Sequence, residues 1–231
     1  MQLENHKAST LLDNSLAGWQ GEGSQSGLYV RVIKRGIDII LSFLALVVFA
    51  PIMLIFAVPI RRDGGPAFFG QQRIGMNGEV FKCWKLRTMR VDADEVLRRI
   101  CASDPKIAAE WEQFQKLKND PRVTRIGRFL RATSLDEIPQ IWNVFVGDMS
   151  LVGPRPMMKE QEELYRSGGG GIGYYGLRPG ITGPWQIDGR GTTTFLDRIG
   201  YDNHYYQTVS LKADIGYIVK TVGVVFQRTG H

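Results

Sequence analysis

The sequence predicts a mainly α-helical protein that carries a small β-hairpin and one hairpin of helix inserted in a membrane. Three observations lead to this fold class. One long apolar run, residues 37–60, contains a proline near its middle, and several later segments repeat apolar residues every three or four positions. Two short β-prone segments flank the turn Gly75–Gly78, which predicts the β-hairpin. We therefore expect a proline-broken, re-entrant membrane helix-hairpin followed by a compact helical domain with interfacial amphipathic helices.

The 231-residue chain has the composition of a folded protein, with 43% hydrophobic and 23% charged residues. It contains 29 Lys+Arg against 23 Asp+Glu, which gives a formal charge of +6. This excess indicates an anionic partner, and composition leaves open whether that is nucleic acid, a phosphate-bearing substrate or an anionic membrane. The two cysteines and three histidines have no metal-binding spacing, so a disulfide framework and a zinc site are both disfavoured.

The chain divides into three predicted parts. Residues 1–30 are expected to form a leader without fixed structure, because the stretch 17–27 is rich in Gly, Ser and Gln and has little to bury. This leader lacks the apolar core of a secretory signal. Residues 31–62 are expected to form the membrane hairpin, and residues 63–231 a domain on the cytoplasmic side.

The apolar run 37–60 admits three interpretations. At about 1.5 Å per residue it is long enough to cross a bilayer core of about 30 Å, so a transmembrane anchor is the simplest. Basic residues lie both before it (34–35) and after it (61–62), and the positive-inside rule therefore keeps both ends in the cytoplasm. Pro51 also removes a helical hydrogen bond near the centre. These features favour a re-entrant hairpin broken at Pro51, whereas a buried globular helix is disfavoured because the run has no polar face.

Two Asp-Pro pairs, 104–105 and 120–121, predict helix starts in which the aspartate is the N-cap and the proline is the first helical residue. After the second pair, arginines recur at every third position and apolar residues alternate with them. The arginines are Arg122, Arg125, Arg128 and Arg131. Such a helix either lies on an anionic membrane or packs on the core with a solvated basic face, and the preceding apolar run favours the membrane.

The segment 133–140 contains the acidic pair Asp136–Glu137 and has two interpretations. Ser134 and Glu137 have the spacing of a capping box, so the segment could simply start a helix. An acidic pair between an arginine-lined helix and Arg155 would instead suit a metal-bound phosphate, because carboxylates hold Mg²⁺ and guanidinium groups neutralise phosphate oxygens. An aspartate can also act as a nucleophile on phosphorus. Lys85 and Arg87 add two cations directly after a β-prone segment, where a solvated charge cluster is the commoner arrangement.

Six motifs in series resemble the bacterial sugar transferases, the monotopic phosphoglycosyl transferases, from about residue 32 to the C-terminus. Any one of them is weak, but their unbroken order is specific. They are Lys34-Arg35 with Asp38 ahead of a Pro-broken apolar run, residues 68–75, Phe81 with 85–89, residues 134–137, residues 147–156, and residues 178–183. Ala50–Pro51 stands where many relatives have Ser-Pro.

The resemblance implies transfer of a sugar-1-phosphate from a UDP-hexose to undecaprenyl phosphate, with release of UMP. In that family the first carboxylate of the dyad is the nucleophile, which corresponds to Asp136, while Glu137 supports Mg²⁺ and proton transfer. The metal would therefore be held by Asp136 and Glu137. The remaining implied site residues bind phosphate (Arg155, Arg131, Lys85 and Arg87) or lie in the nucleotide-sugar region (Gln186 and Arg190).

The same resemblance implies a place on the cytoplasmic face of the bacterial inner membrane, at the first membrane step of exopolysaccharide assembly. The motif spacing resembles the group that starts the repeat unit with galactose- or glucose-1-phosphate. Anionic inner-membrane lipids are expected to bind residues 61–62 and the basic face 122–131. A homodimer stays open. A non-catalytic membrane-surface recruitment protein is the alternative function, and nucleic acid is not expected as a partner because no nucleic-acid motif is present.

Overall fold

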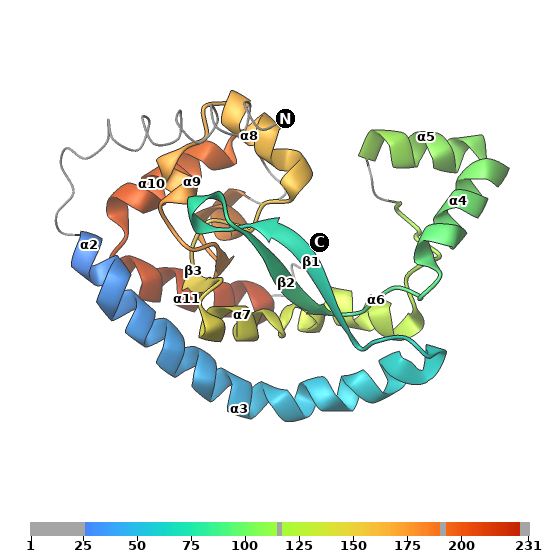
Figure 1. The fold of residues 1–231 in the computed structure, drawn as a ribbon, viewed down its shortest axis with the longest axis horizontal. Helices are drawn as coiled ribbons and strands as arrows, with labels where there is room; N and C mark the ends of the chain where they lie inside the picture. The colour runs from blue at the N-terminus through green and yellow to red at the C-terminus, as the bar shows by residue number, and fades with distance from the viewer. Residues whose placement is uncertain (1–25, 115–116, 190–192, 227–231) are drawn as a thin grey trace. The chain divides into compact units, whose positions relative to one another are not determined.

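The computed structural model describes residues 26–114, 117–189 and 193–226 (Figure 1). This part of the chain is mostly helical and contains two small two-stranded sheets. The predicted mainly α fold with a β-hairpin is therefore confirmed at that level. Of the predicted leader, residues 26–30 are helical and residues 1–25 lie outside the described residues.

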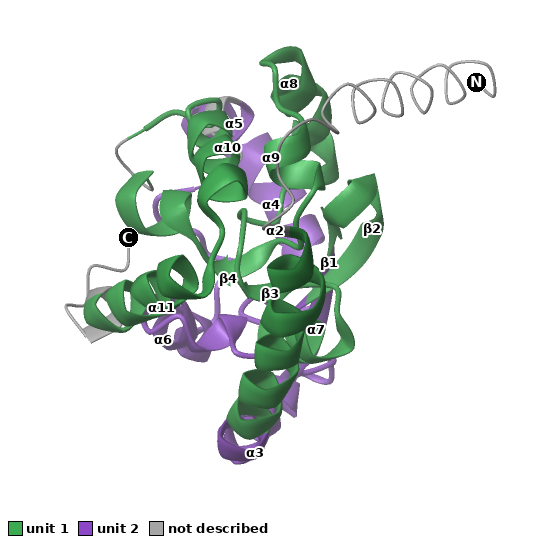
Figure 2. Cartoon of the chain, turned by 90° about the vertical axis from the view of Figure 1, so that its left-hand side faces the viewer, with its two compact units in different colours: residues 1–46, 72–83, 140–227 green, residues 47–71, 84–139, 228–231 purple. Residues whose placement is uncertain are grey.

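The chain forms two compact units (Figure 2). Among the described residues, the first consists of residues 26–46, 72–83, 140–189 and 193–226, and the second of residues 47–71, 84–114 and 117–139. The helices are α2 (Ser26–Leu28), α3 (Lys34–Ile60), α4 (Ala93–Ser103), α5 (Pro105–Phe114), α6 (Arg125–Ala132), α7 (Gln140–Val146), α8 (Glu162–Ser167), α9 (Ile172–Tyr175), α10 (Arg198–Thr208) and α11 (Leu211–Phe226). The strands are β1 (Phe68–Ile74), β2 (Val80–Leu86), β3 (Ser150–Val152) and β4 (Gly180–Thr182).

Helix α3 contains the apolar run, and it continues through Pro51 as one α-helix (Figure 1). The prediction that the helix is interrupted at Pro51 is therefore wrong. A proline removes one backbone hydrogen bond and crowds one carbonyl, and a helix can absorb both by bending without ending. With its flanking turns, residues 29–63, it is long and apolar enough to cross a membrane, and most of this segment is not buried in the protein.

Strands β1 and β2 form the hairpin that the sequence predicts. Between them Asn77 and Gly78 have φ angles of 59° and 81°. Asparagine and glycine are the residues that most readily adopt this left-handed conformation, which is the geometry of tight hairpin turns. The amide of Gly75 donates to the carbonyl of Glu79 at 2.7 Å and closes the turn.

Strands β3 and β4 form a parallel pair that the sequence analysis did not predict, with Ser150 opposite Gly180 and Val152 opposite Thr182. Glycine allows the segments around β3 and β4 to approach closely, because a Cβ on Gly153 would lie 2.3 Å from the carbonyl oxygen of Arg178. The pairing places residues 154–156, the Pro-Arg-Pro unit, directly after β3.

In the second unit the first Asp-Pro helix start is confirmed. Helix α5 begins at Pro105, and the Asp104 carboxylate accepts the amide of Lys106 at 2.8 Å. The second predicted start is wrong, since α6 begins only at Arg125, after the N-cap Thr124. Thr124 accepts the amide of Gly127 at 2.9 Å, which is the standard N-cap bond.

The core of the second unit joins the end of α3 to the hairpin and α6. It consists of Ala57, Ile60, Ala67, Leu86 and Leu130, with Phe56, Ile126 and Leu135 packed around them. Burial of these side chains fixes the end of β2 against α6. The segment that follows α6, residues 133–139, therefore begins at a helix whose position is fixed by this core.

Candidate active site

The acidic pair lies in a single turn of 3₁₀ helix, residues 135–137, between α6 and α7. Ser134 precedes it with a φ of 56°, and its side chain makes no cap hydrogen bond. The capping-box interpretation is therefore wrong, because a left-handed residue turns the chain out of α6 instead of starting a new α-helix. This turn leaves Asp136 buried, with 9% of its surface exposed, and Glu137 half-buried.

Asp136 sits in an electrostatically unusual position for a carboxylate. Its burial raises the pKa of the carboxyl group, and the neighbouring charge of Glu137 raises that pKa further. The positive charges of Lys85 and Arg131 act in the opposite direction. The carboxylate is therefore more basic than a solvated aspartate while two cations lie close enough to influence its charge.

Lys85 lies near the end of β2 and forms an ion pair with Glu137, with 2.7 Å between Nζ and Oε1. Both side chains are partly exposed, so this pair borders solvent. Glu137 thereby has a fixed orientation beside Asp136. Lys85 therefore lies beside the acidic pair, and its role in binding phosphate stays a prediction.

Arg131 lies in the last turn of α6 and is also held by the segment after β2. Its Nε donates to the hydroxyl oxygen of Thr88 at 2.9 Å. Across the described residues, no further hydrogen bond of this guanidinium is found, and the residue is exposed. Its terminal nitrogens are thus oriented by Thr88 and accessible to an anion. Thr88 was not assigned a role from the sequence, and its place in the 85–89 motif was the only available signal.

Arg87 does not fit its predicted role as a phosphate ligand. Its guanidinium donates to both carboxylate oxygens of Asp63 and to the backbone carbonyls of Ile60, Pro66 and Met89. These five hydrogen bonds use all five N–H groups of an arginine. Arg87 therefore fastens the end of α3 to the end of β2, and its guanidinium has no donor left for a substrate.

The basic face predicted for residues 122–131 is only partly present. Arg122 is buried with 5% of its surface exposed, pairs with Asp120 at 2.7 Å and lies 4.7 Å from the centre of the Trp111 ring. It is therefore not available to lipid headgroups. Arg125 and Arg128 are exposed, and a membrane contact by these two residues stays a prediction.

Two of the other predicted site residues belong to the first unit. Arg155 is half-buried in the segment after β3. Gln186 donates from its amide nitrogen to the carbonyl of Gly180 at 3.4 Å, and its buried amide oxygen has no hydrogen-bond partner among the described residues. Arg190 lies outside the described residues. The structure thus brings Asp136, Glu137, Lys85 and Arg131 together in the second unit, whereas Arg155 and Gln186 are described within the first.

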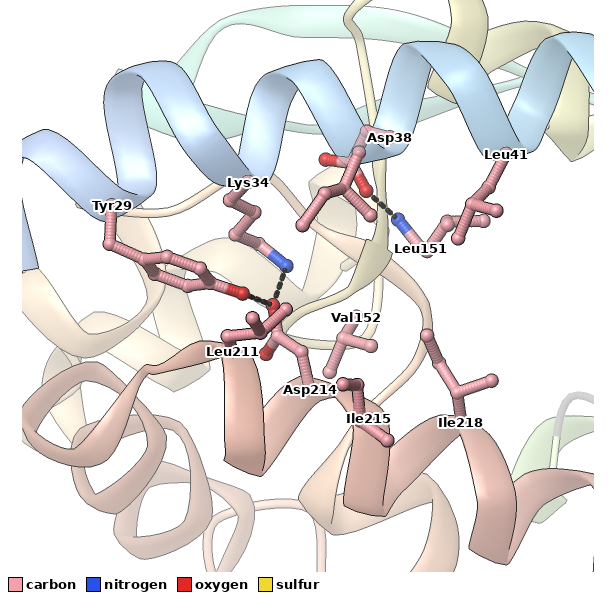
Figure 3. A pocket seen from close by; sticks show the side chains of 11 residues that line it. Tyr29, Lys34, Asp38, Leu41, Leu151, Val152, Leu211, Asp214, Ile215 and Ile218 are labelled. Carbon is pink, nitrogen blue, oxygen red and sulfur yellow. Dashed lines mark hydrogen bonds and ion pairs between the residues drawn. The ribbon is translucent and has the colours of Figure 1, made fainter.

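The start of α3 is anchored within the first unit, beside a small pocket that α3 and α11 line (Figure 3). The Lys34 ammonium pairs with Asp214 at 2.7 Å, and the Tyr29 hydroxyl donates to the same carboxylate oxygen at 2.8 Å. Asp38 accepts the amide of Leu151 at 3.0 Å. These residues of the first motif therefore hold the apolar helix to the folded domain.

Comparison with known proteins decides the family. Residues 29–228 match the family described as "Bacterial sugar transferase". The chain is also 45% identical over 201 residues to an undecaprenyl-phosphate galactose phosphotransferase of Salmonella typhimurium, covering 87% of this chain and 42% of that protein. The chain belongs to the bacterial sugar transferase family.

Two further relatives of this sugar transferase differ in length. The exopolysaccharide production protein ExoY of Sinorhizobium fredii is 43% identical over 195 residues, covering 84% of this chain and 85% of that protein. A UDP-glucose:undecaprenyl-phosphate glucose-1-phosphate transferase of Klebsiella pneumoniae is 42% identical over 198 residues, covering 83% of this chain and 39% of that protein. The chain thus spans less than half the length of several curated relatives that it matches.

Mg²⁺ fits the carboxylates of this sugar transferase under one condition. No group of three or more His, Cys, Asp or Glu side chains that could hold a metal is found among the described residues. Mg²⁺, however, is usually bound through one or two protein carboxylates, with waters and substrate phosphates completing its shell. The adjacent Asp136 and Glu137 meet that requirement when a diphosphate is present.

Proposed function

We propose that this sugar transferase moves a hexose-1-phosphate from a UDP-sugar to undecaprenyl phosphate and releases UMP. The names of the Salmonella and Klebsiella relatives support this lipid acceptor, and they favour galactose or glucose as the hexose. The observation that carries the proposal is Asp136, a buried carboxylate whose pKa burial raises and which two cations accompany. A carboxylate with a raised pKa is more basic, and therefore more nucleophilic at phosphorus, than a solvated aspartate.

The transfer runs in two displacements at the same phosphorus atom. An oxygen of Asp136 attacks the sugar-bearing phosphorus of the UDP-sugar, and the bond from that phosphorus to the UMP oxygen breaks, so UMP leaves with the electron pair. A phosphate oxygen of undecaprenyl phosphate then attacks the phosphosugar-aspartate. The bond to Asp136 breaks, which yields the diphosphate-linked lipid and returns the carboxylate. Splitting the reaction in this way replaces one difficult step with two easier ones.

The cations assist both displacements by neutralising phosphate charge. Arg131 is suited to this because Thr88 orients its guanidinium while its terminal nitrogens remain accessible. Lys85 supplies a second positive charge and also fixes the orientation of Glu137. Arg155 is proposed to bind phosphate through its guanidinium, whose planar fork matches two phosphate oxygens. Preorganised charges of this kind stabilise the transition state without further reorganisation.

We include Mg²⁺ in the proposal, held by Asp136 and Glu137. When bound, the ion would withdraw charge from the diphosphate and stabilise the departing UMP. Glu137 keeps its position through Lys85, so one of its oxygens is already committed to the ammonium group.

The protein is proposed to work on the cytoplasmic face of the inner membrane. The exposed apolar side chains of α3 would cost free energy in water, and burial in lipid removes that cost. The positive residues at both ends support a re-entrant placement, in which neither end crosses the membrane. Because α3 is one continuous helix, this placement would require it to bend at Pro51 instead of ending there. The active site would then lie near the surface where a lipid phosphate and a soluble nucleotide-sugar can meet.

Asp136→Asn tests the nucleophile directly. The variant keeps the size of the side chain, so we expect it to bind membranes normally and to release no UMP in the presence of Mg²⁺, undecaprenyl phosphate and UDP-galactose or UDP-glucose. Asp104→Asn is the matched control, because asparagine caps a helix as well as aspartate does and should leave UMP release unchanged. Substantial UMP release by Asp136→Asn would reject the nucleophile. A wild-type protein that binds membranes but releases no UMP from any UDP-hexose would instead favour a recruitment role.

A further inference from the structure

The backbone of the Pro-Arg-Pro unit is held by a buried arginine on α10. Arg198 is 2% exposed, and its Nη2 donates to the carbonyl oxygen of Arg155. Its Nε donates to the Asp202 carboxylate at 3.4 Å, one turn further along the same helix. An arginine has no acceptor atoms and stays charged, so a buried one must direct its donors at specific oxygens.

Four aromatic rings surround this guanidinium. The ring centres of Tyr165, Tyr174 and Phe195 lie 5.4 Å from it, and the centre of the Trp185 ring lies 5.7 Å away. Tyr165 also donates its hydroxyl to Asp202 at 2.9 Å. The rings restrict the rotation of Arg198, and the negative faces of such rings stabilise a desolvated cation. The four rings and the two hydrogen bonds of Arg198 therefore restrict the position of its guanidinium.

The same cluster holds the chain on the far side of Arg155. The Tyr174 hydroxyl accepts the amide of Met157 at 2.9 Å and donates to the carbonyl of Ile74 at 2.6 Å. Arg73 donates to the carbonyl of Pro156 at 3.1 Å. These hydrogen bonds hold the carbonyls of Arg155 and Pro156 and the amide of Met157. Each bond is made by a buried or partly buried side chain.

We propose that Arg198, clamped by Asp202 and its aromatic ring cluster, is a positioning residue that sets the orientation of Arg155 through its backbone carbonyl. The catalytic role of Arg155 rests on the proposed function. The hydrogen bonds that hold residues 155–157 do not depend on that function. Because Arg198 is buried, we infer that it affects catalysis through the backbone of Arg155 and not by binding substrate itself.

Arg198→Lys removes the fork while retaining the positive charge, because an ammonium group cannot hold a carboxylate and a distant carbonyl in one plane. Arg166→Lys is the matched control. Arg166 also forms an ion pair one helical turn away, with Glu162 at 2.7 Å, and also stacks on a ring, 4.6 Å from the centre of Tyr175. Within the part of the chain that the structure describes, Arg166 makes no hydrogen bond or ion pair with residues 154–157, so its substitution should leave UMP release and hydrogen exchange of that segment unchanged.

Two measurements separate positioning from general stability. We expect Arg198→Lys to lower kcat for UMP release by about tenfold or more, because a displaced Arg155 would stabilise the charge of the transition state less well. In an Arg155→Ala background the same substitution should change the rate less than about twofold, since residues that act through one another are not additive. Rate losses that multiply in the double variant would overturn the proposal.

Amide hydrogen exchange provides a readout that needs no activity. We expect the Met157 amide to exchange at least about tenfold faster in Arg198→Lys than in wild type, because its segment loses a fixed point. Unchanged exchange would overturn the proposal even if activity fell. If Arg198→Lys fails to fold, Asp202→Asn releases the same guanidinium more gently and should show the same non-additivity with Arg155→Ala. An inactive wild type would reject the proposed function, and the exchange experiment would still decide the positioning role.

Discussion

Gly127 on α6 packs directly against the backbone of Thr88, and this contact makes a sharp prediction. A Cβ added at Gly127 would lie 2.0 Å from the Thr88 carbonyl oxygen and 2.8 Å from its carbonyl carbon. The same carbonyl accepts the backbone amide of Thr124 at 3.0 Å and its hydroxyl at 3.3 Å. Since the obstacle is backbone, no side-chain rotation relieves the overlap. Gly127→Ala must therefore push α6 away from Thr88.

The size of the effect follows from opposing contributions. Alanine is favoured over glycine inside a helix by about 1 kcal/mol. Overpacking costs about 1–3 kcal/mol, and weakening the two hydrogen bonds from Thr124 costs about 1 kcal/mol each. The net loss in free energy of unfolding is thus about 2–4 kcal/mol. For a chain of this length that corresponds to a decrease in Tm of roughly 4–16 °C.

Thermal unfolding in detergent is the assay, with Gly216→Ala as the matched control. Gly216 also lies inside a helix, α11, but a Cβ there meets nothing within 4 Å. Only the helix preference then acts, so Gly216→Ala should raise the free energy of unfolding by about 0.5–1 kcal/mol. Opposite shifts in Tm are expected for the two alanine variants. A Gly127→Ala protein that unfolds at or above the wild-type temperature would refute the close packing of α6 on Thr88.

Two further predictions concern buried charges. Arg87→Lys should lower the free energy of unfolding by about 1–3 kcal/mol, because one ammonium group cannot satisfy Asp63 and three carbonyls together. Denaturant unfolding measures the loss, and an unchanged denaturation midpoint would contradict the prediction. Burial raises the pKa of Asp202 to about 6, so the folded state binds this proton more tightly than the unfolded state does. The contribution of Asp202 to stability is therefore greatest below about pH 4 and decreases as the pH rises to about 6, and Asp202→Asn should remove that decrease from a series of unfolding curves. Parallel pH dependence in the two proteins would argue against it.

Local signals in the sequence predict the hairpin and the first helix start because the deciding interactions are themselves local. The turn at Asn77 and Gly78 depends on the conformational preferences of two residues, and the cap of α5 depends on Asp104 alone. The failures occur where a distant partner decides. Strands β3 and β4 have three residues each and pair across about thirty residues of chain, so neither shows a periodicity of its own.

The start of α6 shows how two local signals compete. Asp120–Pro121 has the residue types of a helix start, and the Asp120 carboxylate accepts the amide of Arg122, as Asp104 accepts that of Lys106 before α5. Asp120 also binds the Arg122 guanidinium, and the chain continues as a turn instead of a helix. Thr124 then takes the N-cap position, where its neighbour Gly127 can approach Thr88. The packing of α6 thus selects the later of two possible caps.

The basic residues of the chain differ in their interaction partners, and the sequence alone does not show which partner each one has. Arg122 and Arg87 belong to the predicted anion-binding set, yet carboxylates of the protein engage both. Lys85 also has an acidic partner, but that partner is Glu137, so the ion pair places a cation next to the proposed nucleophile. Arg131 differs from all three because a neutral hydroxyl holds it, which orients the guanidinium without neutralising it. A cation whose hydrogen-bond partner is neutral suits a phosphate better than one paired with a carboxylate, so among these four residues Arg131 is the one we propose to bind substrate.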